Sequence, residues 1–254
     1  MDRLENIDYC IRYLLEQNKA QAAILETLHD KKLLLRSLMN IWSPQPLSDE
    51  FLQAQNVELQ AQLSDKGVVD VRRHSLWKGD ITRLKVDAIV NAANSRGLGC
   101  WHPLHYCVDN AIHSAAGLQL RQECNKILQG DEIATGGAII TPGYNLPAKW
   151  VIHTVGPIVN TPHLISGETS MRVPTKGQEE QLAACYRTCL YLAKEHGCRS
   201  IAFCCISTGE YHFPNRRAAE IAIEVCRESH IRVVFCVYKN TDYNIYRDLL
   251  SARI

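Results

Sequence analysis

The residues best suited to chemistry lie in one stretch, from Asn91 to His113, which carries amides, glycines, thiols, imidazoles and a carboxylate. The residues before it, 86–90, follow an alternating, β-branched pattern that predicts a strand ending at Asn91. Ligands of α/β sheets bind beyond the carboxyl ends of strands, where loops present backbone N–H groups. Asn91 and Asn94 add amides that both donate and accept hydrogen bonds, which suits the hydroxyls of a sugar.

A candidate metal-ligand set lies in the segment C-W-H-P-L-H-Y-C. Cys100, His105 and Cys107 offer two thiolates and an imidazole, which zinc prefers, and leave one tetrahedral position for water or substrate. His102 is the obvious fourth ligand, but its closeness to Cys100 and Pro103 makes simultaneous binding geometrically awkward. We therefore predict one Zn²⁺ per chain with three protein ligands; the alternative is that these side chains only pack.

Asp109 stands between this segment and a helix that the pattern predicts from Asn110 onward. A carboxylate in this place commonly caps the helix by accepting bonds from backbone N–H groups. From position alone, capping is the simpler interpretation. The functional alternative is that the helix start aims the Asp109 carboxylate at a substrate carbon or at a water molecule.

A second candidate loop, 207–211, follows an apolar strand predicted over 200–206. Gly209 and the neighbouring N–H groups are suited to cradle a diphosphate without a cationic side chain. A helix predicted from Asn215 would turn its positive end toward the same anion. An ordinary strand-to-helix turn is the alternative.

Five motifs resemble, in order, those of macrodomains, the ADP-ribose-binding α/β/α modules. They are Gly79-Asp80-Ile81-Thr82, Val90-Asn91-Ala92-Ala93-Asn94, Thr135-Gly136-Gly137-Ala138, Val151-Ile152-His153-Thr154-Val155-Gly156-Pro157 and Ile206-Ser207-Thr208-Gly209. The resemblance covers about Val68 to Ile254 and implies a three-layer α/β/α fold around a central mixed sheet. The Cys-His-Cys loop looks like that of the zinc-dependent microbial branch, whose members remove ADP-ribose from proteins. The common hydrolase branch has an uninterrupted glycine run at this place, so the backbone of the loop must differ here.

The resemblance also implies roles for single residues. Asp80 would accept a hydrogen bond from the adenine amino group while Ile81 packs near the base, although an Asx turn also explains Asp80. Tyr211 would lie against the distal ribose, which Asn94 would hold, and Asp109 would orient or deprotonate the nucleophile. The residues expected to bind ADP-ribose are Asp80, Ile81, Asn91, Ala92, Asn94, Ser207, Thr208, Gly209, Glu210, Tyr211 and Tyr238.

The activity implied is a zinc-dependent hydrolysis that releases mono-ADP-ribose from a protein side chain by cleaving the C1″ linkage of the distal ribose. The resemblance favours an ester to Asp or Glu, with Ser and Arg linkages left open. Microbial relatives suggest a lipoyl-carrier protein as the modified partner. Two alternatives remain, a module that binds ADP-ribose without cleaving it and a deacetylase of O-acetyl-ADP-ribose.

The rest of the chain predicts the elements that position these loops. Residues 1–65 form a predicted helical extension, and 66–254 form the predicted macrodomain. Helical spacing runs over 4–28, 32–42 and 49–63, and Ser48 caps the last of these. We expect the extension to pack on the flank of the macrodomain; partner binding is the alternative. Further strands are predicted within 67–78, 149–155 and 231–238, helices over 178–196 and 243–250, and a polar loop or lid over 160–177.

Composition excludes several classes of protein. With 254 residues and 46% hydrophobic content, the chain can bury a large core and is not disordered. Its 28 basic and 27 acidic side chains leave a net charge of +1, which favours neither nucleic acid nor an anionic membrane. Eleven cysteines, two of them adjacent at Cys204 and Cys205, indicate a reducing compartment rather than a disulfide framework. No apolar run approaches the roughly 18 residues of a membrane span, so we expect a cytoplasmic protein.

Overall fold

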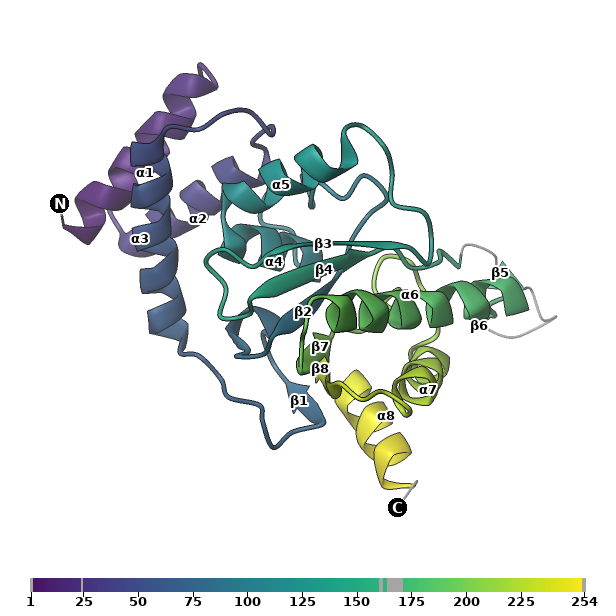
Figure 1. The fold of residues 1–254 in the computed structure, drawn as a ribbon. Coiled ribbons are helices and arrows are strands. Elements are labelled where there is room, and N and C mark those ends of the chain that lie inside the picture. Colours follow the sequence, from purple (N-terminus) through teal and green to yellow (C-terminus); the bar gives the residue numbers. More distant parts are fainter. Residues whose placement is uncertain (1, 24, 160–161, 164–170, 253–254) are drawn as a thin grey trace.

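The computed structural model describes residues 2–23, 25–159, 162–163 and 171–252 (Figure 1). The helices are α1 (Arg3–Gln17), α2 (Leu28–Asn40), α3 (Asp49–Lys66), the short 3-10 helix η1 (Ile81–Arg83), α4 (Val108–Ala116), α5 (Leu118–Leu128), α6 (Lys176–Glu195), α7 (Asn215–Cys226) and α8 (Asn240–Ser251). The strands are β1 (Leu76–Lys78), β2 (Ala88–Ala92), β3 (Ala138–Pro142), β4 (Trp150–Thr154), β5 (Pro162–His163), β6 (Met171–Arg172), β7 (Ser200–Phe203) and β8 (Arg232–Val237). Within this described part of the chain, no helix is long and apolar enough to cross a membrane.

Six strands form one mixed sheet in the order β1-β8-β7-β2-β4-β3. Neighbouring strands are parallel, except that β3 runs antiparallel to β4. Helices α4 and α5 cover one face of the sheet, and α6, α7 and α8 cover the other (Figure 1). The predicted three-layer α/β/α fold around a central mixed sheet is therefore confirmed.

The register of the sheet brings the two candidate loops together. Strands β2 and β7 are parallel neighbours, with Ala88 opposite Ile201 and Ile89 opposite Ala202. All four residues of β7 are buried, as the apolar run predicted for a strand covered on both faces. Because parallel strands end at the same edge, the loop after β2 and the loop after β7 leave the sheet side by side.

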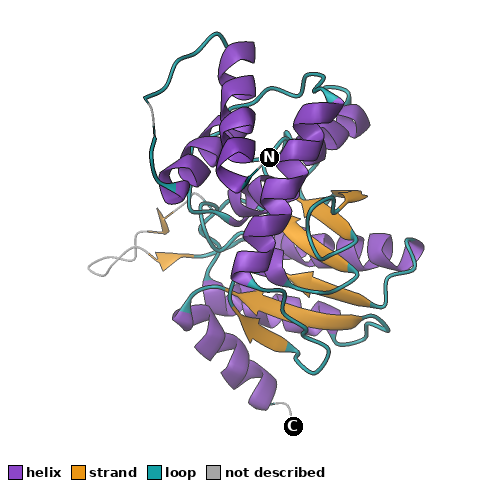
Figure 2. Cartoon of the chain, turned by 90° about the vertical axis from the view of Figure 1, so that its left-hand side faces the viewer, coloured by secondary structure: helices purple, strands orange, loops and turns teal. Residues whose placement is uncertain are grey.

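The amino-terminal helices form a small core of their own. Fully or almost fully buried side chains from all three helices meet there, and Leu118 of α5 joins them. The extension thus packs against the α4 and α5 layer, on the flank of the sheet domain, as predicted (Figure 2). The members of this core are Ile7, Cys10, Ile11, Leu14, Leu35, Leu38, Met39, Trp42, Phe51, Ala54, Leu59 and Leu118.

Two local predictions need correction. The helix predicted over 4–28 is too long, because α1 ends at Gln17 and α2 starts only at Leu28. The Asn18 side chain donates back to the Leu14 carbonyl at 3.0 Å, and the next residue turns left-handed with φ 51°, which stops the helix. Of the strands predicted within 67–78, only β1 and a single bridge at Val69 form.

The predicted loop over 160–177 contains more regular structure than its composition suggested. β5 and β6 pair as a short antiparallel ladder, and α6 begins earlier than predicted, behind a capping box formed by Thr175 and Gln178. The part of this loop that includes Glu168 lies outside the described residues.

The extension core generates a stability prediction. Phe51 is fully buried and stacks on Tyr13 with 4.5 Å between ring centroids, so Phe51→Ala should cost about 3–5 kcal/mol of unfolding free energy. Val57, on the same helix, is 61% exposed, so Val57→Ala should change stability by less than about 0.5 kcal/mol. Urea unfolding of both variants checks this, and similar losses for the two would contradict the assigned core.

Candidate active site

A cavity of about 1020 Å³ lies at the carboxyl edge of the sheet. The loops after β1, β2, β7 and β8 line it, and one face each of α2 and α3 completes its wall. Of the residues predicted to bind a ligand or metal, those that line it are Asp80, Ile81, Ala92, Asn94, Cys100, His105, Cys107, Asp109, Ser207, Thr208, Gly209, Glu210, Tyr211 and Tyr238. Asn91 is the exception, because it is fully buried beneath Asp109.

The Asp109 carboxylate is held from two sides. Asn91, on β2, donates its amide Nδ2 to Asp109 Oδ1 at 2.7 Å, and Asn94 Nδ2 approaches Oδ2 at 3.4 Å. The second Asn91 amide hydrogen points to His153 Nδ1 at 3.1 Å, and His153 Nε2 lies 3.0 Å from the Thr141 hydroxyl. Asn91 therefore orients the carboxylate, and its predicted direct contact with a ribose does not follow from this position.

The predicted capping role of Asp109 is wrong in detail. Helix α4 begins at Val108, and its N-cap is Cys107, whose sulfur accepts from the Asn110 backbone N–H at 3.3 Å. Asp109 lies within the first turn, with its side chain in the cavity instead of on the helix end. The position of a carboxylate in the first turn is favourable in any case, because the helix dipole is positive there.

Burial governs the charges around Asp109. Only 5% of Asp109 is exposed, and this desolvation raises its pKa to about 6 despite the hydrogen bond from Asn91 and the charge of Arg121. Burial also lowers the pKa of His153 to about 3, so this imidazole is neutral. Asp109 thus titrates close to neutrality, in the range useful to a general base.

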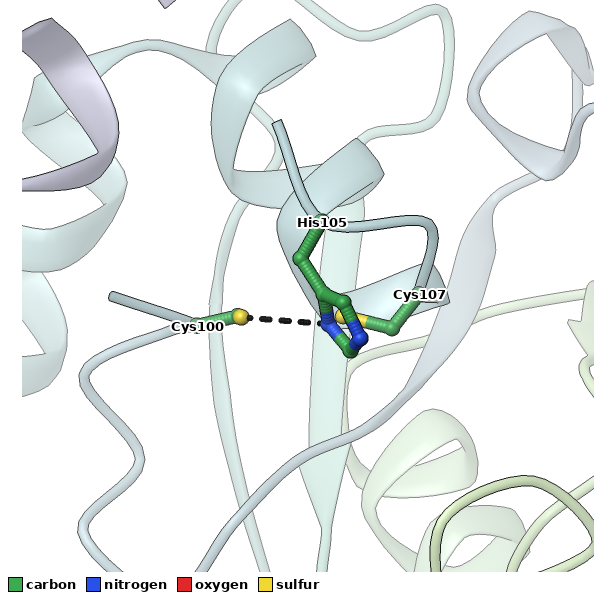
Figure 3. Close-up of side chains that lie close together, drawn as sticks. All are labelled: Cys100, His105 and Cys107. Carbon is green, nitrogen blue, oxygen red and sulfur yellow. Dashed lines mark hydrogen bonds between the residues drawn. The ribbon is translucent and has the colours of Figure 1, made fainter. Parts of the chain in front are cut away.

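The three predicted metal ligands converge, as Figure 3 shows. One ligand atom from each of Cys100, His105 and Cys107 lies within 4.8 Å of the others, and Cys100 Sγ is 3.5 Å from His105 Nδ1. Zinc–sulfur and zinc–nitrogen bonds of ordinary length at a tetrahedral angle would separate the two atoms by about 3.6 Å. The donor set and its spacing therefore fit zinc, and His102 is not part of the group.

Metal binding would change the protonation of the Cys107 thiol. Burial raises the pKa of the Cys107 thiol to about 12, so a neutral thiol is the stable form unless a cation is near. Metal binding requires the thiolate and releases a proton, which couples affinity to pH. Glu210, from the loop after β7, reaches to within 3.9 Å of His105 Nε2, so the two loops meet at this group.

The backbone of the loop after β7 is open toward the cavity. Ser207 is left-handed with φ 64°, and its buried hydroxyl has no partner among the described residues. Within the same described set, the N–H groups of Gly209, Glu210 and Tyr211 make no hydrogen bond to the chain. Such free N–H groups on a turn form a cradle for an anion.

The opposite end of the cavity carries the residues expected at adenine. Asp80 Oδ1 accepts from the backbone N–H and the hydroxyl of Thr82, at 3.0 and 2.6 Å, so the Asx turn forms. Asp80 Oδ2 lies 3.3 Å from Lys66 Nζ of α3. Burial opposes ionisation, but the bonds from Thr82 and the charge of Lys66 hold the Asp80 pKa below its usual value. Asp80 is thus a charged acceptor on the cavity wall, which Tyr238, 72% exposed, also lines.

Comparisons with known proteins identify the family. The Macro domain model matches residues 90–222. A protein-ADP-ribose hydrolase of Treponema medium is 44% identical over 99% of this chain and 100% of its own length, and one of Staphylococcus aureus is 39% identical over 99% and 98%. The chain belongs to the macrodomain family.

Solved macrodomain structures share this fold. The Oceanobacillus iheyensis macrodomain with ADP is 38% identical, with a TM-score of 0.58 over 72% of this chain and 93% of that one. The Trypanosoma brucei macrodomain in complex with ADP-ribose is 28% identical, with a TM-score of 0.58 over 89% of this chain and 97% of that one. The Trypanosoma brucei structure matches 89% of this chain, so the match extends beyond the residues of the sheet domain.

Sequence reasoning missed Arg121. Its guanidinium is buried on α5 and donates to the carbonyls of Leu98, Met39 and Trp42, while Trp101 lies over it at 4.3 Å. Burial lowers its pKa to about 10, which leaves it charged at neutral pH. Its place among Leu118, Leu120, Cys124 and Leu128, apolar residues of α5, was the available signal, because buried charge requires partners.

Arg121 therefore joins the extension to the loop that carries the metal ligands, residues 98–107. Arg121→Lys should destabilise this macrodomain. A lysine cannot reach three carbonyls in the same fork, so we expect a loss of about 1–3 kcal/mol. Arg187→Lys is the control, since Arg187 is exposed and its ion pair with Glu180 lies on the surface. Thermal or urea denaturation measures both, and equal stability of the Arg121 variant and the parent would refute the assigned role.

Proposed function

We propose that this macrodomain is a hydrolase that releases mono-ADP-ribose from protein side chains by cleaving the C1″ linkage of the distal ribose, with one zinc ion in the site. The observation that carries the proposal is the meeting of three features in one cavity. These are the buried Asp109 carboxylate, the Cys-His-Cys group and the open N–H groups after β7. Relatives named protein-ADP-ribose hydrolase match almost the whole chain, which supports the same reaction.

The chain supplies recognition groups for the adenine, the diphosphate and the distal ribose. Asp80 is a charged acceptor suited to the adenine amino group, and Ile81 beside it is apolar and buried. The N–H groups of 209–211 suit the diphosphate. Tyr211, half-buried against the small apolar cluster of Leu128, Ile133 and Val155, offers its ring to the distal ribose. The cavity is large enough for this ligand with room for part of a modified side chain.

Asp109 is the proposed general base. A water molecule attacks C1″, its proton passes to the Asp109 carboxylate, and the bond from C1″ to the side-chain oxygen breaks with the electron pair on the leaving group. A carboxyl group with a pKa near 6 is a better base at neutrality than an ordinary aspartate. Asn94, whose Nδ2 also donates to the Gly99 carbonyl at 3.2 Å, holds the ribose beside it.

Cys100, His105 and Cys107 would hold the zinc ion. When bound, zinc supplies Lewis acidity that polarises a ribose oxygen or makes a water more acidic. The backbone around these ligands is tight, because Gly99 is left-handed with φ 81° and packs on the ring of His113. A Cβ on Gly99 would lie 2.7 Å from that ring, so no other residue fits there without moving it.

The proposal extends to the substrate and its compartment. We propose an ester to Asp or Glu as the preferred linkage, because a carboxylate leaving group departs without a proton. A lipoyl-carrier protein is the proposed modified partner. All eleven cysteines are free thiols, which agrees with a reducing, cytoplasmic setting.

Substitution of Asp109 separates binding from turnover. Asp109→Ala should retain most of the affinity for ADP-ribose and lose activity by about 100-fold or more, since it removes only the proton acceptor. Calorimetric titration with ADP-ribose measures the affinity, and release of ADP-ribose from an automodified ADP-ribosyltransferase measures the activity. Asp131→Ala, an exposed acid outside the cavity, is the control. A parent protein that binds ADP-ribose but releases none from any linkage would establish a reader instead.

Removal of the metal tests the Cys-His-Cys group. We expect about one zinc per chain in the parent and almost none in Cys100→Ala, with hydrolysis lost in parallel and after chelation. Cys226→Ala, which removes a thiol of α7 away from the cavity, should keep its zinc. Elemental analysis together with the release assay measures this. Full activity in a metal-free parent would move the chemistry to Asp109 and Asn94 alone.

A further inference from the structure

The metal-ligand loop, residues 98–107, is attached to helix α2 of the extension. Asn40, the last residue of α2, accepts from the Leu104 backbone N–H through Oδ1 at 3.0 Å. Leu104 is left-handed with φ 57°, a conformation that costs free energy for a side chain of its type. Leu104 directly precedes the ligand His105, so the Asn40 bond fixes the backbone where that imidazole leaves the loop.

Both ends of the Asn40 side-chain amide make hydrogen bonds. It is 1% exposed, and its Nδ2 donates to the Ser114 hydroxyl of α4 at 3.0 Å. The amide is therefore held between the loop and the helix that carries Asp109. Without Asn40, the partly buried Leu104 N–H would lose its partner, and the left-handed turn would lose its restraint.

A second tether from α2 acts through Asn110. Arg36 donates to Asn110 Oδ1 through Nε at 3.1 Å and Nη2 at 2.6 Å. The other end of that amide, Asn110 Nδ2, donates to the His102 carbonyl at 3.0 Å. The Asn110 backbone N–H bonds to the sulfur of Cys107. Arg36 thus orients a residue that holds the loop on both sides of Leu104, through its side-chain amide at His102 and its backbone N–H at Cys107.

We propose that helix α2 is part of the active site, and that Asn40 is a positioning residue that presets His105 for the metal. The inference rests on the zinc site proposed above. The loop has no helix or strand of its own between Leu98 and Cys107. Apart from one turn, in which the His105 N–H donates to the His102 carbonyl at 3.2 Å, its geometry is set from outside, by the Asn40 and Arg36 contacts and by the Arg121 bond to Leu98.

The test compares two buried asparagines of the extension. Asn6 is also almost fully buried and donates to the Ala54 carbonyl at 2.8 Å, but that bond stays within the extension. Asn6→Ala therefore removes a comparable amide without touching the loop. Zinc affinity is measured on both full-length variants by competition with a chromophoric chelator, which requires no substrate and no turnover.

Asn40→Ala should weaken zinc binding about 10- to 100-fold, the usual effect of losing a partner that orients a ligand. Asn6→Ala should bind zinc like the parent at a temperature where both variants are folded. Cobalt substituted for zinc should show altered ligand-field absorption in Asn40→Ala alone, because the ligand geometry changes. If Asn40→Ala does not fold, Arg36→Met replaces it and should weaken zinc binding in the same direction.

Equal zinc affinity in Asn40→Ala, Asn6→Ala and the parent overturns the positioning role and leaves the zinc site standing. Equal weakening in the two variants overturns it as well, because the effect would then follow general loss of stability. A parent that binds no zinc overturns the zinc proposal itself, and the role of Asn40 falls with it. The zinc content of the parent is therefore measured first.

Discussion

The burial of one carboxylate is the constraint on which this site depends. A charged Asp109 in a cavity wall is unfavourable unless hydrogen bonds replace the water it lost. Asn91 supplies the shortest of these bonds, and its own amide is oriented by His153 and Thr141 from β4 and β3. Three neighbouring strands thus contribute to holding a single side chain. The compensation is incomplete, which is why the pKa of Asp109 remains raised.

The same constraint explains the polar residues at the centre of an apolar sheet. His153 is fully buried, and it accepts from Asn91 only as a neutral imidazole, which its low pKa ensures. A protonated His153 would have no lone pair for the amide, and Asn91 would have to turn away from Asp109. His153 is therefore structural, but its effect reaches the cavity through one amide.

Much of this arrangement could be predicted from the sequence because it is local. The strands that lead into the Asn91–Asn94 segment and toward Ser207, and the short spacing of Cys100, His105 and Cys107, are patterns of neighbouring residues. Parallel strands then bring the two loops to one edge. The helix boundary at Asp109 could not be predicted in detail, because Cys107 takes the cap by offering its sulfur to a backbone N–H. That choice depends on how the preceding loop folds.

The contacts of the extension could not be predicted because they join residues more than 60 positions apart, such as Asn40 and Leu104. Helical spacing predicts only that α2 has an apolar face, and Leu35, Leu38 and Met39 confirm it. Asn40 is the one polar residue on this buried face of the described helix, and a buried amide is stable only with hydrogen-bond partners on both sides. An irregular loop that must hold three metal ligands requires restraints from elsewhere in the fold. Helix α2 supplies them, so the packing of the extension against the sheet domain also preorganises the site.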